Sequence, residues 1–201
     1  MQLVVLANEL QWEELATELP GVEWIKAAHP FRFDLYNNAT AFFILQEQAG
    51  IAFSQTNKPV FLNTVTSTLK EAGSGSNVVG INGWHTFLQR PLWEVTGELS
   101  EDTAAILKRI NKTAISVSDE PGFIAARTVA MIINEAYFAF GDGVSTKEEI
   151  DTAMKLGTNY PYGPFVWAEK IGLQQVLTLL EKLFETDQRY RPAPALIKEV
   201  Q

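Results

Sequence analysis

Short apolar runs alternate with polar, helix-like stretches along the first half of the chain. An apolar run of a few residues between turn residues is typical of a buried strand. Strands that alternate with helices predict an α/β layered domain. We therefore expect strands over 3–6, 22–27, 41–46, 59–63, 77–81, 92–96 and 114–117, and helices over 11–19 and 100–110.

The pattern changes near Ser118, and from there on the chain has only helical patterns. We predict a helix that begins at Pro121 and runs to Phe140, a helix with a capping box of Ser145 and Glu148 that ends near Leu156 before Gly157, a loop over 159–164, and a helix over 173–184. Pro192 and Pro194 are expected to end the regular structure. The sequence thus predicts two domains, an α/β domain over 1–118 and an all-helical domain over 119–201.

Composition narrows the possible functions. Of 201 residues, 46% are hydrophobic and 20% charged, which indicates a packed globule. A formal net charge of −8 disfavours nucleic acid as a partner. The absence of cysteine excludes disulfides and thiol catalysis, and two histidines, His29 and His85, are too few for a His-rich metal centre.

Neither a membrane span nor a secretion signal is expected. No segment approaches the ~18 uninterrupted apolar residues of a membrane helix. The first residues lack a basic region and soon become acidic at Glu9. We therefore expect a cytoplasmic protein.

A glycine fingerprint for dinucleotide binding is missing after the first predicted strand. Such a fingerprint lets a helix N-terminus approach a pyrophosphate, but here the strand is followed by Ala7, Asn8 and Glu9. The glycine-rich stretch over 73–76 follows a helix-like stretch over 67–72 and is better explained as a flexible connection. No bound cofactor is therefore predicted.

His85 and Glu94 form the one candidate acid–base pair. A carboxylate can fix the tautomer of a histidine and stabilise its charged form, although a partly exposed histidine without a role is the simpler interpretation. The aromatic residues Trp84, Phe87 and Trp93 surround this segment. They suit the core of a sheet, or else a groove for an acyl chain.

A series of motifs after Ser118 resembles the C-terminal helical domain of the 3-hydroxyacyl-CoA dehydrogenases. The motifs come in the family's order and are Asp119-Glu120-Pro121-Gly122-Phe123-Ile124-Ala125-Ala126-Arg127, Asn134-Glu135-Ala136, Gly143-Val144-Ser145, Glu149-Ile150-Asp151, Met154-Lys155-Leu156-Gly157, Pro161-Tyr162-Gly163-Pro164-Phe165, Ile171-Gly172-Leu173 and Tyr190-Arg191-Pro192-Ala193-Pro194-Ala195-Leu196. Upstream, 58–64, 78–82 and 92–95 are similar to strands of the family's NAD domain. The resemblance implies a shortened, degenerate Rossmann-like α/β domain before the helical one.

The resemblance also implies where the catalytic residues of the family would fall. The family transfers hydride between NAD and a 3-hydroxyacyl-CoA with a histidine, a glutamate that orients it, and a serine and an asparagine that hold the substrate oxygen. The glutamate matches Glu94, but the histidine falls on Asn82, the serine on Val65 and the asparagine on Ala126. Asparagine has no useful proton-transfer pKa, and valine and alanine side chains form no hydrogen bond. Candidate substrate-cleft residues are Asn63, Thr64, Thr66 and Trp84.

The main functional prediction is a family member of fatty-acid metabolism that has lost NAD-dependent dehydrogenase activity and binds an acyl-CoA or another small ligand as a homodimer. The dimer follows from the resemblance and from the long apolar helix, which is alternatively the core helix of its own domain. Two other interpretations stay open. One is an active 3-hydroxyacyl-CoA dehydrogenase that uses Glu94 with His85, and the other is a structural or regulatory dimerisation module.

Overall fold

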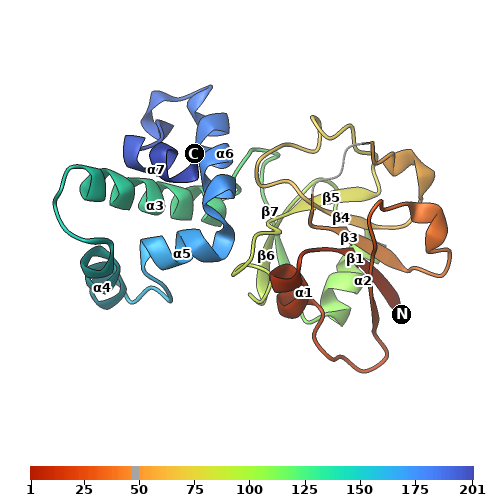
Figure 1. The fold of residues 1–201 in the computed structure, drawn as a ribbon. Helices are drawn as coiled ribbons and strands as arrows, with labels where there is room; N and C mark the ends of the chain where they lie inside the picture. Colours follow the sequence, from red (N-terminus) through yellow and green to blue (C-terminus); the bar gives the residue numbers. More distant parts are fainter. Residues whose placement is uncertain (47–49) are drawn as a thin grey trace. The chain divides into compact units, whose positions relative to one another are not determined.

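The computed structural model describes residues 1–46 and 50–201. Its internal contacts divide the chain into two compact units, Met1–Phe123 and Ile124–Gln201. Each unit is described by itself, and Figure 1 shows the ribbon of both.

The first unit is built on a seven-stranded sheet with the order β2-β1-β3-β4-β5-β6-β7. All neighbouring strands are parallel except β5 and β6, which are antiparallel. Each predicted strand has a counterpart in this sheet. The strands are β1 (Gln2–Leu6), β2 (Glu23–Lys26), β3 (Ala41–Ile44), β4 (Val60–Asn63), β5 (Val78–Ile81), β6 (Leu92–Thr96) and β7 (Thr113–Ser116).

The two α-helices of the first unit lie on the same face of the sheet. Helices α1 (Glu9–Leu15) and α2 (Glu101–Arg109) pack on the face that includes Phe43, Phe61 and Trp93. The other face is covered by the short 3-10 helices η1 (Phe33–Leu35) and η2 (Phe53–Gln55) and by turns. The strand order reverses direction at β1, as in a doubly wound fold, but only β2 lies on its far side. This confirms the predicted shortened Rossmann-like domain.

The expected helix-like stretch over 67–72 is wrong, because these residues form successive turns. Asp119 contacts these turns. Its carboxylate accepts hydrogen bonds from the backbone amides of Leu69 (3.0 Å) and Lys70 (3.4 Å), which lie far away in the sequence. A long-range acceptor of this kind has no signature in the local pattern of hydrophobic and polar residues.

The second unit is all-helical, as predicted. Its helices are α3 (Ala125–Gly141), α4 (Lys147–Thr158), α5 (Pro164–Ile171), α6 (Leu173–Phe184) and α7 (Pro194–Val200), with the 3-10 helix η3 (Gln188–Tyr190) before α7. Helix α3 is the central element, and its buried face includes Ala130 and Ile133. Asn134 on the same face donates to the Arg191 carbonyl (2.9 Å) and accepts from the Ala193 amide (2.8 Å), which fixes the chain before α7.

Several helix ends differ from the prediction. Helix α3 begins at Ala125 rather than at Pro121, because Gly122 and Phe123 adopt left-handed φ angles of 87° and 49°. Helix α4 has its capping box one residue later than predicted, at Thr146 and Glu149. It continues through Gly157 and ends at Asn159, which is left-handed with φ 56°. Pro194 opens α7 instead of ending the regular structure, since proline fits the first turn of a helix.

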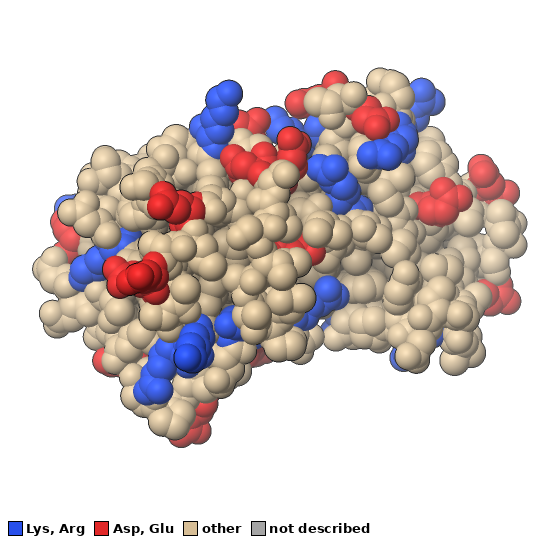
Figure 2. Space-filling view, turned by 180° about the vertical axis from the view of Figure 1, so that it is seen from behind, with Lys and Arg blue, Asp and Glu red and all other residues tan. Residues whose placement is uncertain are grey.

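Two further properties of the folded chain are the distribution of charged side chains on its surface and the hydropathy of its helices. On the face that Figure 2 shows, acidic and basic side chains lie intermixed, so the excess of acids does not gather there into one field. Within the described residues, none of the helices has the length and hydropathy needed to span a membrane.

Candidate functional site

The carboxyl ends of β1, β3, β4 and β5 lie at one edge of the sheet, because these strands are parallel to one another. In open α/β sheets, ligands bind beyond the carboxyl ends of the strands, next to the point where the strand order reverses. Here that point lies between β1 and β3. The residues that follow these strands therefore form the candidate site.

The turn after β1 does not fit a dinucleotide. The Asn8 side chain accepts from the Gln11 amide (2.9 Å), and the Gln11 side chain accepts from the Asn8 amide (3.1 Å). This capping box uses amides that a pyrophosphate would need. Glu9 opens the helix with a negative charge and pairs with Lys26 (2.6 Å), which ends β2 where a ribose would require an acid.

A network of neutral amides joins the strand ends. The buried Gln11 side chain donates to the carbonyls of Leu45 (3.2 Å) and Gly83 (2.8 Å), and Gln46 donates to the Gln11 oxygen. Asn63 donates to the Leu45 carbonyl (3.3 Å) and accepts from the Gly83 amide (3.1 Å). None of these side chains titrates, so the network can fix the backbone but cannot transfer a proton.

Strand register brings Thr64, Asn82 and Glu94 together. Asn63 pairs with Ile81 in the β4–β5 ladder, so the next pair along is Thr64 and Asn82. Ile81 pairs with Val95 in the antiparallel β5–β6 ladder, so the next residue of the first strand, Asn82, comes opposite Glu94. Paired residues project from the same face of a sheet.

That face is the one covered by η1, η2 and turns. Trp93 and Val95, on either side of Glu94, belong to the core under α1 and α2, and side chains alternate along a strand. Glu94 therefore projects from the opposite face. Asn82, one residue beyond β5, therefore faces Glu94 when the β5–β6 register is extended by one pair.

Three buried polar atoms in this region have no hydrogen-bond partner in the described part of the chain. They are the Thr64 hydroxyl oxygen, the Asn82 side-chain nitrogen and the Trp84 indole nitrogen. Thr64 is 2% exposed and Asn82 is 9% exposed. A buried donor left without an acceptor costs about 1–3 kcal/mol. These three groups are therefore the buried polar atoms of this region whose hydrogen bonds are unsatisfied.

His85 lies next to Glu14 of α1, with 3.4 Å between its Nε2 and a carboxylate oxygen. Both side chains are largely buried, at 15% and 11% exposed. Burial raises the pKa of Glu14, and the neighbouring His85 and the amides of Thr86 and Leu88 act in the opposite direction. The structure thus places His85 with a carboxylate on the helix-covered face, and its pairing with Glu94 stays a prediction.

The other predicted residues are distributed around these groups. Asn63 belongs to the amide network, and Trp84 is buried with its ring 6.4 Å from that of Phe87. Val65, at the expected serine position, is buried, and its carbonyl accepts from the Gly122 amide (2.7 Å). Thr66, next to Val65, is half-buried. Ala126 belongs to the second unit, where it lies fully buried in α3.

Sequence reasoning missed Gln11, Glu14 and Arg90. The Arg90 guanidinium interacts electrostatically with both Glu94 and Glu14, and burial lowers its pKa. Gln11 and Glu14 lie three residues apart and thus on one side of α1. Gln11 is buried on the face of α1 that also carries Leu15. A polar residue on the apolar face of a predicted helix is the sequence feature that could have identified it.

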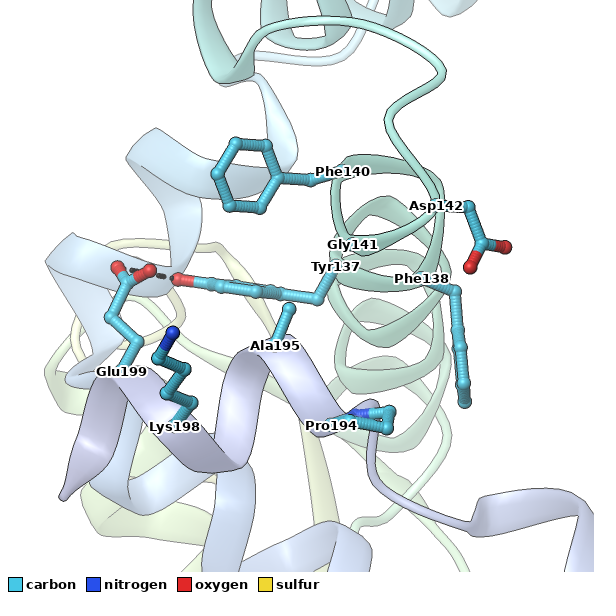
Figure 3. A pocket seen from close by; sticks show the side chains of 9 residues that line it. All are labelled: Tyr137, Phe138, Phe140, Gly141, Asp142, Pro194, Ala195, Lys198 and Glu199. Atoms are coloured by element: carbon cyan, nitrogen blue, oxygen red, sulfur yellow. Dashed lines mark hydrogen bonds between the residues drawn. The ribbon is translucent and has the colours of Figure 1, made fainter.

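The second unit has a groove of about 670 Å³ beside the end of α3 and the start of α7. Figure 3 shows Tyr137 pointing toward Glu199, to which it donates a hydrogen bond (2.9 Å), whereas Phe138 and Asp142 lie on the other side of the helix. Burial raises the pKa of Tyr137. The Lys147 ammonium pairs with Glu199. Tyr137, Glu199 and Lys147 are thus linked to one another beside this groove.

Metal chemistry has no support in the described part of the chain, where no group of three or more potential ligand side chains is found. The candidate site therefore rests on hydrogen-bond donors and on the single carboxylate of Glu94.

Comparison with known proteins gives a consistent family assignment. Residues 122–201 match the family model of the 3-hydroxyacyl-CoA dehydrogenase C-terminal domain. The chain is 49% identical to 3-hydroxyadipyl-CoA dehydrogenase of Escherichia coli (strain K12) over 92 residues, which is 45% of this chain and 19% of that protein. It is 37% identical to 3-hydroxybutyryl-CoA dehydrogenase of Clostridioides difficile over 150 residues, which is 69% of this chain and 53% of that protein.

A solved structure supports the same relationship across both units. The (S)-3-hydroxybutyryl-CoA dehydrogenase from Ralstonia eutropha superposes with a TM-score of 0.67 at 26% sequence identity, covering 88% of this chain and 69% of that one. The chain spans about half or less of the length of the two curated relatives described above.

Proposed function

Because this chain belongs to the 3-hydroxyacyl-CoA dehydrogenase family, we propose that it binds the acyl-CoA ligands of that family without exchanging hydride with NAD. The observation that carries this proposal is Asn82, which lies next to Glu94 in register where the family resemblance implies the histidine. An asparagine side chain can donate a hydrogen bond to a carbonyl oxygen, but it cannot accept the proton of a hydroxyl group as a base.

The proposed loss of NAD binding is supported by the turn after β1. Asn8 and Gln11 use each other's amides, and Glu9 places a carboxylate at the start of the helix. Lys26 occupies the end of β2, where the dinucleotide fold has an acidic residue for the ribose. We therefore derive no step of a reaction through this cofactor.

Ligand binding is supported by the buried donors of Thr64, Asn82 and Trp84. A hydroxyl, an amide and an indole N–H can each bind the acceptor oxygen of a 3-oxoacyl thioester. Glu94 on the same face can accept from the hydroxyl group of a 3-hydroxyacyl ligand. The site would thus hold the polar part of an acyl-CoA with hydrogen bonds alone.

Acetoacetyl-CoA distinguishes binding from turnover. Isothermal titration calorimetry is expected to detect its binding, and the absorbance of NADH is expected to stay constant when the protein and acetoacetyl-CoA are added. Steady oxidation of NADH would contradict the proposal. So would a shift of the melting temperature by NAD, and so would the absence of any heat with acetoacetyl-CoA.

A matched pair of variants locates the binding site. Asn82→Leu removes a buried donor and is expected to weaken acetoacetyl-CoA binding by about tenfold or more, which corresponds to one lost hydrogen bond. Gln89→Leu changes an exposed amide of the same segment and is expected to leave the affinity unchanged. Equal effects of the two substitutions would place the ligand elsewhere.

We further propose that the protein is a homodimer formed through the helical unit. Helix α4 has no buried side chain, and Leu156 on it is 80% exposed. Val144, just before α4, is 72% exposed. These side chains would be covered by a second copy of the same surface, the partner that closed symmetry provides. Sedimentation velocity measures the oligomeric state directly.

A further inference from the structure

The segment between β5 and β6 is buried although it has no regular structure. Of residues 82–88, all except His85 are buried, and the backbone forms only turns and bends after Asn82 and Gly83. Irregular backbone normally lies at the surface, because its N–H and C=O groups need partners. The partners of this segment are side chains from distant parts of the chain.

Helix α1 supplies two of these side chains. Gln11 donates to the Gly83 carbonyl (2.8 Å). The Glu14 carboxylate accepts from the Thr86 amide at 2.9 Å and 2.8 Å through its two oxygens, and also from the Leu88 amide. The helix that would offer its N-terminus to a pyrophosphate in a dinucleotide-binding fold therefore holds a loop with its side chains here.

Thr86 shows why the loop needs this support. Its φ angle is +80°, a left-handed conformation that is unfavourable for a β-branched residue. The two oxygens of Glu14 bind the amide of this residue directly. Other side chains hold the carbonyls of the same segment, since Trp93 and Lys112 both donate to the Leu88 carbonyl (3.2 Å and 2.7 Å).

We propose that Glu14, assisted by Gln11, is a positioning residue that fixes segment 82–88 and thereby orients Asn82 and Trp84 toward the ligand. The inference rests on the proposed function for the identity of that ligand. Asn82 and Trp84 lie only four and two residues before Thr86, and the Trp84 amide donates to the Asn82 side chain (3.3 Å). A shift of the backbone at Thr86 therefore moves the donors of the candidate site.

Amide hydrogen exchange tests the contact itself in the full chain. In Glu14→Gln, exchange of the Thr86 and Leu88 amides is expected to be about tenfold faster than in wild type, because an NH2 group that cannot accept a hydrogen bond replaces one of the two acceptor oxygens. Glu14→Ala is expected to exceed this effect. Glu13→Gln changes an exposed carboxylate on the same helix and is expected to leave both amides protected. Equal protection in Glu13→Gln and Glu14→Gln would overturn the proposal.

Acetoacetyl-CoA binding tests the consequence. The affinity is expected to fall about tenfold in Glu14→Ala and less in Glu14→Gln, in the same order as amide protection. An affinity that stays constant while the two amides lose protection would show that the contact does not position the ligand site. If wild type itself binds no acetoacetyl-CoA, the proposed function is wrong, and amide exchange alone then decides whether Glu14 holds the loop.

A pH series separates positioning by charge from a purely steric role. Because burial raises the pKa of Glu14, protonation favours the buried state of this side chain, so protection of the Thr86 amide in wild type should increase on acidification, whereas in Glu14→Gln it should not. The charged groups that face Glu14 are His85, Arg90 and Lys112. The series is repeated in His85→Gln to remove the second group that titrates in acid. Parallel profiles for wild type and Glu14→Gln would overturn the role of the charge.

Discussion

Two glycines near the strand ends have no space for a larger side chain, because neighbouring segments of the backbone approach each other closely there. A Cβ atom at Gly83 would lie 2.7 Å from the Cβ of Asn63, and one at Gly80 would lie 2.3 Å from the Thr64 hydroxyl. The close approach at Gly83 allows Asn63 to accept from the Gly83 amide. These glycines are therefore needed for packing of the candidate site rather than for flexibility.

Gly83→Ala should destabilise the protein by about 1–3 kcal/mol, because the added methyl group displaces Asn63 from the amide network. Gly157→Ala is the matched control, since nothing lies within 4 Å of its added Cβ and it belongs to helix α4. That substitution should stabilise the protein by about 0.5–1 kcal/mol. Urea unfolding measures both, and a neutral Gly83→Ala would contradict the tight packing.

Glu14 should make stability depend on pH. Burial raises its pKa in the folded protein above the ordinary value of 4.5. Its contribution to the unfolding free energy is therefore fully present below the unfolded pKa and is lost as the pH rises through the folded pKa. Glu14→Gln does not titrate at this position. The unfolding free energy of wild type minus that of Glu14→Gln should thus decrease with rising pH.

Urea titrations of wild type and Glu14→Gln between about pH 4 and pH 8 measure this difference. Glu13→Gln, which removes an exposed carboxylate one position earlier, controls for the loss of net charge. A difference that increases with pH would mean that the surrounding amides and cations outweigh the cost of burial at Glu14.

At the scale of elements, α4 is attached to its unit by polar contacts rather than by buried apolar side chains. None of its residues is buried. Asp151 of α4 accepts from the first free amides of α5, those of Phe165 (2.7 Å) and Val166 (3.1 Å). The N-cap residue of α5 is Gly163, which has no side chain to do so. One helix therefore caps the next.

Asp151→Ala should lower the unfolding free energy by about 1–2 kcal/mol, because it leaves the amides of Phe165 and Val166 without their acceptor. Asp151→Asn keeps one acceptor oxygen and should cost less. The order of the two variants in urea unfolding tests the capping role. Equal losses would assign the effect to packing against Gly163, whose Cβ would lie 2.3 Å from the Asp151 carboxyl carbon.

At the scale of the whole molecule, the exposed apolar side chains of the helical unit lead to the proposed dimer. Leu156→Lys places a charge on the most exposed of them and should convert a dimer to a monomer. Gln175→Lys adds the same charge at an exposed position of α6 and should leave the dimer intact. Sedimentation velocity distinguishes the two states. A wild-type monomer at micromolar concentration would contradict the proposal.

Much of the architecture was predictable from local patterns. Apolar runs located all seven strands, and the helix over 173–184 agrees with α6 (Leu173–Phe184) at both ends. The failures have both distant and local components. The turns over 67–72 are bound by the distant Asp119, and α3 starts late because two residues just before it are left-handed. Contacts between residues distant in sequence have no periodic signature, so pattern reasoning cannot find them.

Sequence alone determined the seven strands, the all-helical character of the second unit, the family resemblance and the presence of asparagine at the family's histidine position, twelve residues before Glu94. Only the tertiary structure decided which side chains meet. Register set Asn82 beside Glu94 on one face, while the β5–β6 segment took His85 to Glu14 of α1 on the other. The physical reason is that residue spacing fixes the face along a strand, whereas a buried loop follows the distant groups that satisfy its backbone.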